Sequence, residues 1–161
     1  MNRRQLVAGL LLLPWVLLSS CATVTSEPAA GADPRSGIAV VTLADGSTRV
    51  DIATDAAFDY GSAVLRPAFA VQLAPIMKPY SQQSVRVSGF TDNVGAADYN
   101  LNLSRQRAQA VADALVTQGF NAAKLSVSGY GEGNPVASNA DANGRYRNRR
   151  IELLIPVNTD G

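Results

Sequence analysis

Residues 89–108 read GFTDNVGAADYNLNLSRQRA and join a buried strand to an amphipathic helix through a polar stretch. The strand is indicated by the alternation of Val85 and Val87 with polar residues. Ser104 is predicted to be the N-cap of a helix that runs to about Gln118. The connection between strand and helix is longer than usual and dense in Asp, Asn, Thr and Gly. This composition favours a hydrogen-bonded loop that binds a ligand.

The chain before this stretch predicts a hairpin and a first helix. Residues 38–52 show two apolar runs around Asp45-Gly46, where the hairpin turn needs positive φ angles. An apolar helical face is predicted over residues 67–80, beginning at Pro67. Pro75 lies inside this segment and is expected to kink or shorten the helix.

The chain after this stretch adds two more strands. Residues 125–127 are short and apolar, and Ile151, Leu153 and Ile155 alternate in the last strand. Leu154 indicates that the other face of this strand is partly covered as well. Strands interleaved with two helices predict an α/β two-layer sandwich.

The first 21 residues have the character of a targeting signal. Arg3 and Arg4 precede an apolar run over residues 6–18, which is too short to span the ~30 Å hydrocarbon core of a bilayer. The run ends Leu18-Ser19-Ser20-Cys21, which resembles a bacterial lipobox, and Cys21 is the only cysteine. Residues 1–20 are therefore predicted to be a lipoprotein signal peptide. The alternative is an incidental thiol beside an ordinary cleavage site.

A lipobox implies that lipid is attached to Cys21, and acyl chains would make the membrane anchor effectively permanent. Ala22 follows the cysteine, which favours sorting to the outer membrane. Residues 21–37 are predicted to be the lipidated cysteine and a flexible linker, since they are rich in Ala, Pro, Ser, Thr and Gly. The domain is expected over residues 38–157, followed by a tail over residues 158–161.

Composition excludes several kinds of chemistry. The 161 residues carry a net charge of only +1, which excludes a strongly basic nucleic-acid binder. The chain has no histidine, so His-based triads and His-containing zinc sites are excluded. Residues 139–144 imitate the start of a calcium loop, but Arg150 stands where a bidentate Glu is required. We expect no metal and no cofactor.

The sequence also offers few residues that could act in catalysis. A wall-cleaving glycosidase needs two carboxylates across a cleft, for which Asp92 and Asp98 are the candidates. Loop carboxylates that cap the backbone or bind ligand are the preferred interpretation, and we expect no enzyme.

Asp92 and Arg107 suggest a receptor for a zwitterion. Asp92 follows the end of a strand, and Arg107 is predicted to lie in the first turn of the next helix. A carboxylate held apart from a guanidinium can bind an ammonium and a carboxylate of one ligand. The alternative is that Asp92 and Arg107 pair with each other.

These residues carry a family resemblance. Gly89 to Gly95, Tyr99-Asn100, Leu103-Ser104-x-x-Arg107-Ala108 and Asn148-Arg149-Arg150-Ile151-Glu152 resemble the OmpA C-terminal domain family, which includes the peptidoglycan-associated lipoproteins. The resemblance covers about residues 36–157. It implies a mixed sheet with the helices packed on one face, and non-covalent binding of peptidoglycan through the meso-diaminopimelate of its stem peptide.

The resemblance also implies roles for particular residues. Asp92 is expected on the ligand ammonium and Arg107 on its carboxylate, with Thr91 and Asn100 in support. The other implied peptidoglycan-binding residues lie at the first βα junction and at the start of the last strand, and they are Phe58, Asp59, Arg149 and Arg150. Strand alternation lets only one of the last two face the ligand.

Arg145 and Arg147 are expected to form a solvated rim. The function implied is that of an outer-membrane lipoprotein that anchors the membrane to the cell wall, with the domain in the periplasm. The alternative is a periplasmic protein-interaction module of a trans-envelope complex, in which wall binding is secondary. Peptidoglycan, the outer membrane and periplasmic proteins are the partners considered, and nucleic acid is not.

Overall fold

The structure is a computed structural model that describes residues 37–157. The predicted signal peptide, Cys21 and nearly all of the predicted linker lie outside the described residues, as does the predicted tail. Within residues 37–157, no helix has the length and apolar character needed to cross a membrane.

Five strands form one mixed sheet. The strands are β1 (Ile38–Thr42), β2 (Thr48–Ala53), β3 (Val85–Gly89), β4 (Leu125–Gly129) and β5 (Arg150–Ile155). Their order across the sheet is β1-β2-β5-β3-β4, and only the β3–β4 pair is parallel. A parallel pair requires a long crossover connection. Here the connection from β3 to β4 contains the polar loop predicted to bind a ligand, followed by a helix.

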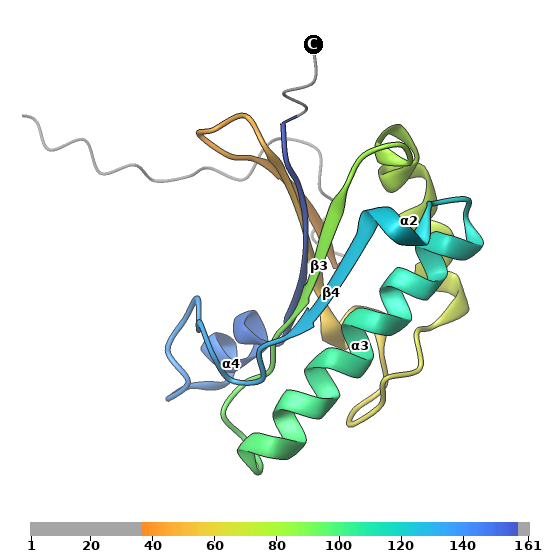
Figure 1. The fold of residues 1–161 in the computed structure, drawn as a ribbon. Helices are drawn as coiled ribbons and strands as arrows, with labels where there is room; N and C mark the ends of the chain where they lie inside the picture. The colour runs from red at the N-terminus through yellow and green to blue at the C-terminus, as the bar shows by residue number, and fades with distance from the viewer. Residues whose placement is uncertain (1–36, 158–161) are drawn as a thin grey trace, which may run out of the picture.

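The helices lie on both sides of this sheet but unequally. They are α1 (Thr54–Ala57), α2 (Pro67–Met77), α3 (Ala97–Thr117) and α4 (Ala142–Asn148), with short 3₁₀ turns at Lys78–Tyr80 and Ala122–Lys124. Figure 1 shows α2 and α3 packed on one side, with the short α4 on the other side near the start of β5. The predicted two-layer α/β sandwich with a mixed sheet is confirmed.

The core lies between the sheet and the α2–α3 layer. Alternate strand residues point into it and are fully buried, among them Val50, Ile52, Val85, Val87, Ile151 and Leu153. The facing helices contribute Phe69, Leu73, Met77, Val111 and Leu115. Burying a side chain of this size stabilises the fold by about 1.5–3 kcal/mol, so the period-2 and helical patterns determine which layer each element joins.

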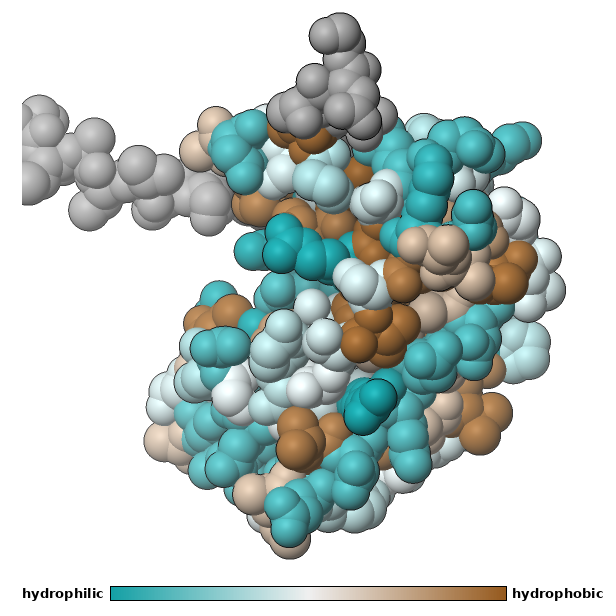
Figure 2. Space-filling view, in the orientation of Figure 1, coloured by the Kyte–Doolittle hydropathy of each residue, from teal (hydrophilic) through white to brown (hydrophobic). Residues whose placement is uncertain are grey.

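The other face of the sheet is largely open. Figure 2 shows it hollowed between the β1–β2 hairpin and the α4 region. Its strand residues are mainly polar, and Arg49 and Asp51 form an ion pair there with 2.9 Å between Nε and Oδ1. Burial raises the pKa of Asp51 despite this pair. Leu154 is half-buried on this face, as expected.

The α-helix is shorter than the predicted segment 67–80, as expected from Pro75: α2 ends at Met77 and continues into the 3₁₀ turn at Lys78–Tyr80. The predicted hairpin turn needs correction. In the hairpin, Gly46 has a φ of +82°, but Asp45 does not have a positive φ. The Asp45 carboxylate instead accepts hydrogen bonds from the N–H and hydroxyl of Ser47.

The predicted N-cap at Ser104 is wrong, because α3 begins at Ala97. Ser104 is completely buried inside the helix. Its hydroxyl donates to the carbonyl of Leu101 at 2.8 Å and accepts from the N–H of Gly131 at 2.9 Å. The serine therefore ties the helix to the loop after β4, a role that local sequence rules cannot separate from capping.

The last residues of β3 and β4 are glycines because α3 crosses them at very short range. A Cβ on Gly89 would overlap the backbone carbonyl of Ser104. A Cβ on Gly129 would lie 2.5 Å from the backbone nitrogen of Arg105. Backbone atoms cannot rotate away as the end of a flexible side chain can, so any larger residue must displace the helix.

Gly89→Ala is expected to lower the free energy of unfolding by about 1–3 kcal/mol, since it overpacks the helix–strand contact. The measurement is urea denaturation at neutral pH. Ser128→Ala, on the exposed face of β4, serves as the control and should change stability by less than about 0.5 kcal/mol. A Gly89→Ala protein as stable as the control would contradict the contact.

Candidate functional site

A pocket of about 450 Å³ opens where the end of β3 and the start of β5 meet α1 and α3. Four segments far apart in the sequence build its wall: the chain around α1, the loop after β3, the first half of α3 and the end of α4. The residues that line it are Thr54, Asp55, Phe58, Asp59, Tyr60, Gly61, Arg66, Thr91, Asp92, Val94, Tyr99, Asn100, Leu103, Arg107, Arg145 and Arg149.

The loop after β3 is held by its own hydrogen bonds. The carboxylate of Asp92 accepts from the N–H of Val94 at 3.0 Å. The amide of Asn100 donates to the carbonyls of Asp92 and Val94 at 3.3 and 3.1 Å. The N–H of Thr91 donates to the carbonyl of Gly131 at 2.7 Å. These bonds fix the loop around Asp92, and the Asn100 side chain contributes two of them.

Asp92 pairs with Arg149, not with Arg107. Its Oδ2 lies 2.7 Å from Nη1 of Arg149, and its side chain is only 11% exposed. Arg149 also forks onto Asp55, with 2.9 Å from Nε to Oδ1 and 2.6 Å from Nη2 to Oδ2. The two carboxylates raise the pKa of Arg149, and hydrogen bonds from Arg149 lower the pKa of Asp55.

Arg107 is buried and has no carboxylate partner among the described residues. Its Nε donates to the carbonyl of Ser62 at 2.8 Å, and its guanidinium lies 5.4 Å from the centre of the Phe58 ring. Burial lowers the pKa of Arg107, although the charge of Asp55 opposes this shift. Such a guanidinium is a ready site for an anion.

Thr91 provides a second unsatisfied group in the same pocket. It is 5% exposed, and its Oγ1 has no hydrogen-bond partner in the structure. Buried hydroxyls are normally paired, so Thr91 is an exception among the polar groups around the pocket. The Arg107 guanidinium favours a ligand that carries an anionic group.

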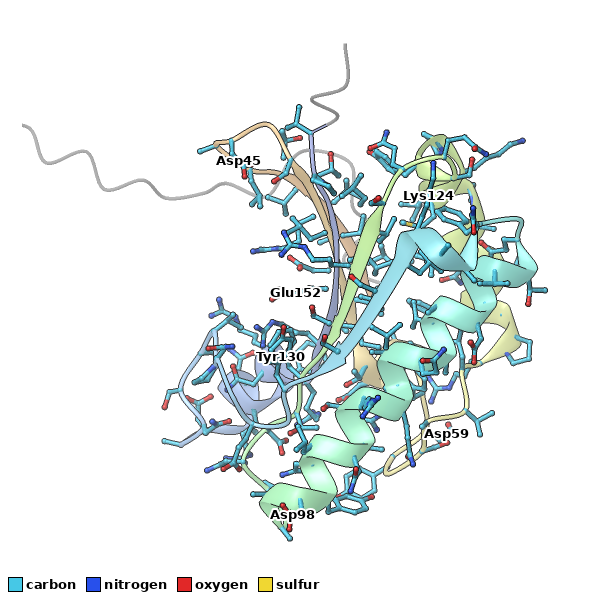
Figure 3. All side chains as sticks on the ribbon, viewed as in Figure 1. Asp45, Asp59, Asp98, Lys124, Tyr130 and Glu152 are labelled. Atoms are coloured by element: carbon cyan, nitrogen blue, oxygen red, sulfur yellow. The ribbon has the colours of Figure 1, made fainter. Side chains whose placement is uncertain are left out.

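Phe58 and Asp59 both line the pocket but differ in character. Phe58 is 1% exposed and supports Arg107 from beneath. The Asp59 side chain is 79% exposed and pairs with Arg66 at 2.8 Å. Figure 3 shows Asp59 and Asp98 at the same end of the molecule, away from Asp45 in the hairpin.

Of the two consecutive arginines, Arg149 lines the pocket and Arg150 does not. Arg150 points to the open face of the sheet, where its Nε lies 2.7 Å from Oε1 of Glu152. Figure 3 shows Glu152 on the side of the sheet away from α3. The Arg150 guanidinium lies 3.9 Å from the centre of the Phe90 ring, which itself stacks on Tyr130. Of the two alternatives left open by strand alternation, Arg149 is therefore the arginine that lies at the pocket.

The expected rim of Arg145 and Arg147 holds only for Arg147, which is exposed. Arg145 is half-buried, lines the pocket and donates to the carbonyl of Asn139 at 3.0 Å. Asn148 secures this region, because its fully buried side chain bonds the backbone of Val136 and Ala137.

The expected candidates for a carboxylate pair and for a calcium loop are not assembled as such sites in residues 37–157. Asp98 lies in the first turn of α3 and is not part of the pocket wall, so it does not face Asp92 across a cleft. Asp141, in the calcium-loop look-alike, caps α4 by accepting from the N–H of Gly144 at 2.7 Å. No group of three or more His, Cys, Asp or Glu side chains within residues 37–157 could hold a metal ion.

Asp55 is the site residue that sequence reasoning missed. It lies at the second position of the four-residue α1, and no spacing pattern links it to Asp92 or Arg149. Its proximity arises because β2 pairs with β5 in the register Ala53–Arg150, which places the start of α1 beside Arg149. Only a correct strand pairing could have revealed it.

The comparisons with known proteins identify the family to which this fold belongs. Residues 57–149 match the OmpA family, and the chain belongs to that family. The probable lipoprotein YiaD of Escherichia coli strain K12 is 41% identical over 118 residues, which are 71% of this chain and 54% of YiaD. The family expected from the motifs is confirmed.

Two further similarities concern the cell wall by name. The peptidoglycan-binding protein ArfA of Mycobacterium tuberculosis strain H37Rv is 40% identical over 84 residues, covering 52% of this chain and 26% of ArfA. The structure of the cell wall anchor of the T6SS from Pseudomonas aeruginosa superposes with a TM-score of 0.65 at 35% identity, covering 75% of this chain and 88% of that one. The matched region spans about half or less of YiaD and ArfA.

The Asp55–Arg149 pair makes folding stability depend on pH. Because the pKa of Asp55 is lowered in the folded state, its contribution is present above about pH 4 and is lost as the pH falls through the folded value. Asp55→Asn should therefore lose at most about 1 kcal/mol at pH 7, since the pair is partly exposed. The difference from wild type should shrink below about pH 4 in denaturation experiments. A difference that stays constant down to pH 2.5 would contradict the pairing.

Proposed function

We propose that this protein is an outer-membrane lipoprotein whose domain binds peptidoglycan non-covalently, by the diaminopimelate of the stem peptide, and so anchors the membrane to the cell wall. The observation that carries the proposal is the buried Arg107, which has no carboxylate partner in a pocket that also holds Asp92. Diaminopimelate keeps one free end with an ammonium and a carboxylate, and it offers one partner to each of these two groups.

In this binding mode the ligand carboxylate receives hydrogen bonds from the terminal nitrogens of Arg107, since Nε is already used by Ser62. The ligand ammonium donates to the carboxylate of Asp92, where Arg149 and Val94 leave acceptor capacity. Each charge-assisted bond contributes about 1.5–3 kcal/mol.

The relatives support the wall as the source of this ligand. One is named as a peptidoglycan-binding protein, another as a probable lipoprotein, and a similar structure is that of a cell wall anchor. The proposed role of the pocket is binding and not catalysis.

Arg107→Ala and Asp92→Asn are each expected to weaken binding to diaminopimelate-type sacculi at least tenfold, because each removes one charge-assisted bond. The measurement is co-sedimentation of the mature, lipid-free chain with purified sacculi. Arg147→Ala removes an exposed charge outside the pocket and serves as the matched control, with binding unchanged.

An Arg107→Ala protein that still pellets with sacculi like wild type would refute the zwitterion site. If wild type itself stays in solution, wall binding is wrong, and the protein-interaction alternative takes its place.

Cys21→Ser tests the anchor separately, because it removes the only thiol that could carry lipid. The variant is expected in the soluble periplasmic fraction, whereas wild type is recovered with the outer membrane on fractionation of the envelope. Retention of Cys21→Ser in the membrane fraction would contradict lipid anchoring while leaving the pocket proposal intact.

A further inference from the structure

The pocket wall carries more positive than negative charge. All three of its aspartates are already engaged by arginines of the same wall, two of them by Arg149 and one by Arg66. The other two arginines, Arg107 and Arg145, have no carboxylate partner among residues 37–157. The charged side chains of the wall are Asp55, Asp59, Asp92, Arg66, Arg107, Arg145 and Arg149.

A zwitterion supplies a carboxylate for only one of these two arginines. In the binding mode proposed above, the ligand carboxylate binds Arg107 and the ligand ammonium binds Asp92. Since a zwitterion has no net charge, its binding leaves the surplus positive charge of the wall in place. Arg145 is the group that remains without a counter-ion.

Arg145 has hydrogen-bond donors that a ligand can use. Its Nη1 donates to the carbonyl of Asn139 at 3.0 Å, whereas Nε and Nη2 have no hydrogen-bond partner within the described residues. The side chain is half-buried in the pocket wall, while that of Arg147 is exposed and lies outside the wall. A guanidinium with unused N–H groups favours an anion with two oxygens, such as a carboxylate.

The backbone of Arg145 is held in place on both sides. A Cβ on Gly144 would overlap the carbonyl oxygen of Ser138, so only glycine allows α4 to lie this close to the preceding chain. On the other side, the side chain of Asn148 bonds both backbone polar groups of Ala137. Arg145 is therefore presented to the pocket by a short helix that is fixed before and after it.

Arg145 and Arg149 lie one helical turn apart, and the N–H of Arg149 donates to the carbonyl of Arg145 at 3.1 Å. Residues at this spacing share a helix face, where like charges repel each other. Two aspartates balance the charge of Arg149, but no carboxylate within residues 37–157 balances that of Arg145. A ligand carboxylate at Arg145 would offset this repulsion.

The two unpaired arginines come from different sides of the sheet. Arg107 lies on α3 and Arg145 on α4, and these helices cover opposite sides (Figure 1). A ligand that contacts both arginines must therefore extend across the pocket. The volume of about 450 Å³ is typical of pockets that enclose whole small ligands, so there is room for more than one amino-acid end group.

We propose that Arg145 forms a second anion subsite of the pocket, which takes a further carboxylate of the same stem peptide. This inference rests on the proposed binding of diaminopimelate peptide. Beyond the zwitterionic end, a stem that ends at diaminopimelate offers two such groups. One is the α-carboxylate of its D-Glu, and the other is the carboxylate on the diaminopimelate carbon whose nitrogen is acylated. The pocket thereby selects stem peptides in which this carboxylate is free and not amidated.

The test is isothermal titration calorimetry of the mature, lipid-free chain with three synthetic peptides. The first is N-acetyl-L-Ala-γ-D-Glu-meso-diaminopimelate with all of its carboxylates free. The second has an amide in place of the D-Glu α-carboxylate. The third has an amide in place of the carboxylate on the acylated side of diaminopimelate. All three keep the zwitterionic end, so they differ only in the group offered to Arg145.

Wild type is expected to bind the first peptide about fivefold more tightly than at least one of the amides, and that amide identifies the carboxylate that Arg145 takes. The preference is modest because solvent screens a half-buried arginine. Arg145→Gln should remove the preference, while its affinity for that amide stays within about twofold of wild type. Glutamine can still donate to the carbonyl of Asn139, so the contact within the chain is retained.

Arg147→Gln is the matched control, because Arg147 lies on the same helix but is exposed outside the pocket. It removes the same charge and should keep the wild-type preference. Arg145→Lys is a second variant, which retains the charge and is a milder change if Arg145→Gln folds poorly. Its preference for the free acid should remain at least twofold.

Several results would overturn the inference. Equal affinity of wild type for all three peptides would show that no second subsite exists, while leaving the proposed function intact. A preference that survives in Arg145→Gln, or an equal weakening of all three peptides, would leave Arg145 only a structural role. The same loss in Arg147→Gln would indicate overall charge, and complete loss in Arg145→Lys would contradict attraction to the charge. Failure of wild type to bind any of the peptides would instead refute the proposed function, and the inference with it.

Discussion

Where α3 crosses the ends of β3 and β4, Gly89 and Gly129 leave nothing but backbone between helix and strands. This contact sets the position of α3 relative to the loop after β3, which together form one side of the pocket. It places the Ser104 hydroxyl on the N–H of Gly131, whose carbonyl in turn takes the N–H of Thr91. The loop that carries Asp92 and the helix that carries Arg107 are thus both bonded to Gly131, just after β4. A shift of the helix would move Arg107 relative to Asp92.

Some polar groups of the pocket have their hydrogen-bonding partners within the chain, and others do not. Arg149 is satisfied by two carboxylates, and Asn100 is satisfied by two carbonyls. Arg107 is buried with a carbonyl partner, Ser62, but with no carboxylate partner among the described residues, and the hydroxyl of Thr91 has no hydrogen-bond partner. Burial of an uncompensated cation is unfavourable, and here the opposing contribution is the nearby charge of Asp55. The groups that remain open are those that gain most from a ligand.

Much of the fold was predictable because burial imposes strict periodicity. The alternation of Val85 with Val87 and of Ile151 with Leu153 places these side chains in the core, and the strands follow. Ser104 misled because a serine before an apolar helical face resembles a cap, whereas its partner, Gly131, is distant in sequence. Asp92, Arg107, Thr91 and Asn100 could be named from motifs. Asp55, and the choice of Arg149 over Arg150, depend on the β2–β5 register and on which face β5 presents.

The side chain of Asn148 has a consequence for how such a domain can diversify. Its amide fastens Val136, Ala137 and Asn139 to the end of α4 through four hydrogen bonds. Residues 136–139, which precede α4, are therefore bonded to the last residue of α4, just before Arg149. Insertions between Gly131 and Val136 would lie at the molecular surface, outside the segment that Asn148 holds. That connection is free to vary in length and to acquire new contacts while the geometry of the pocket stays constant.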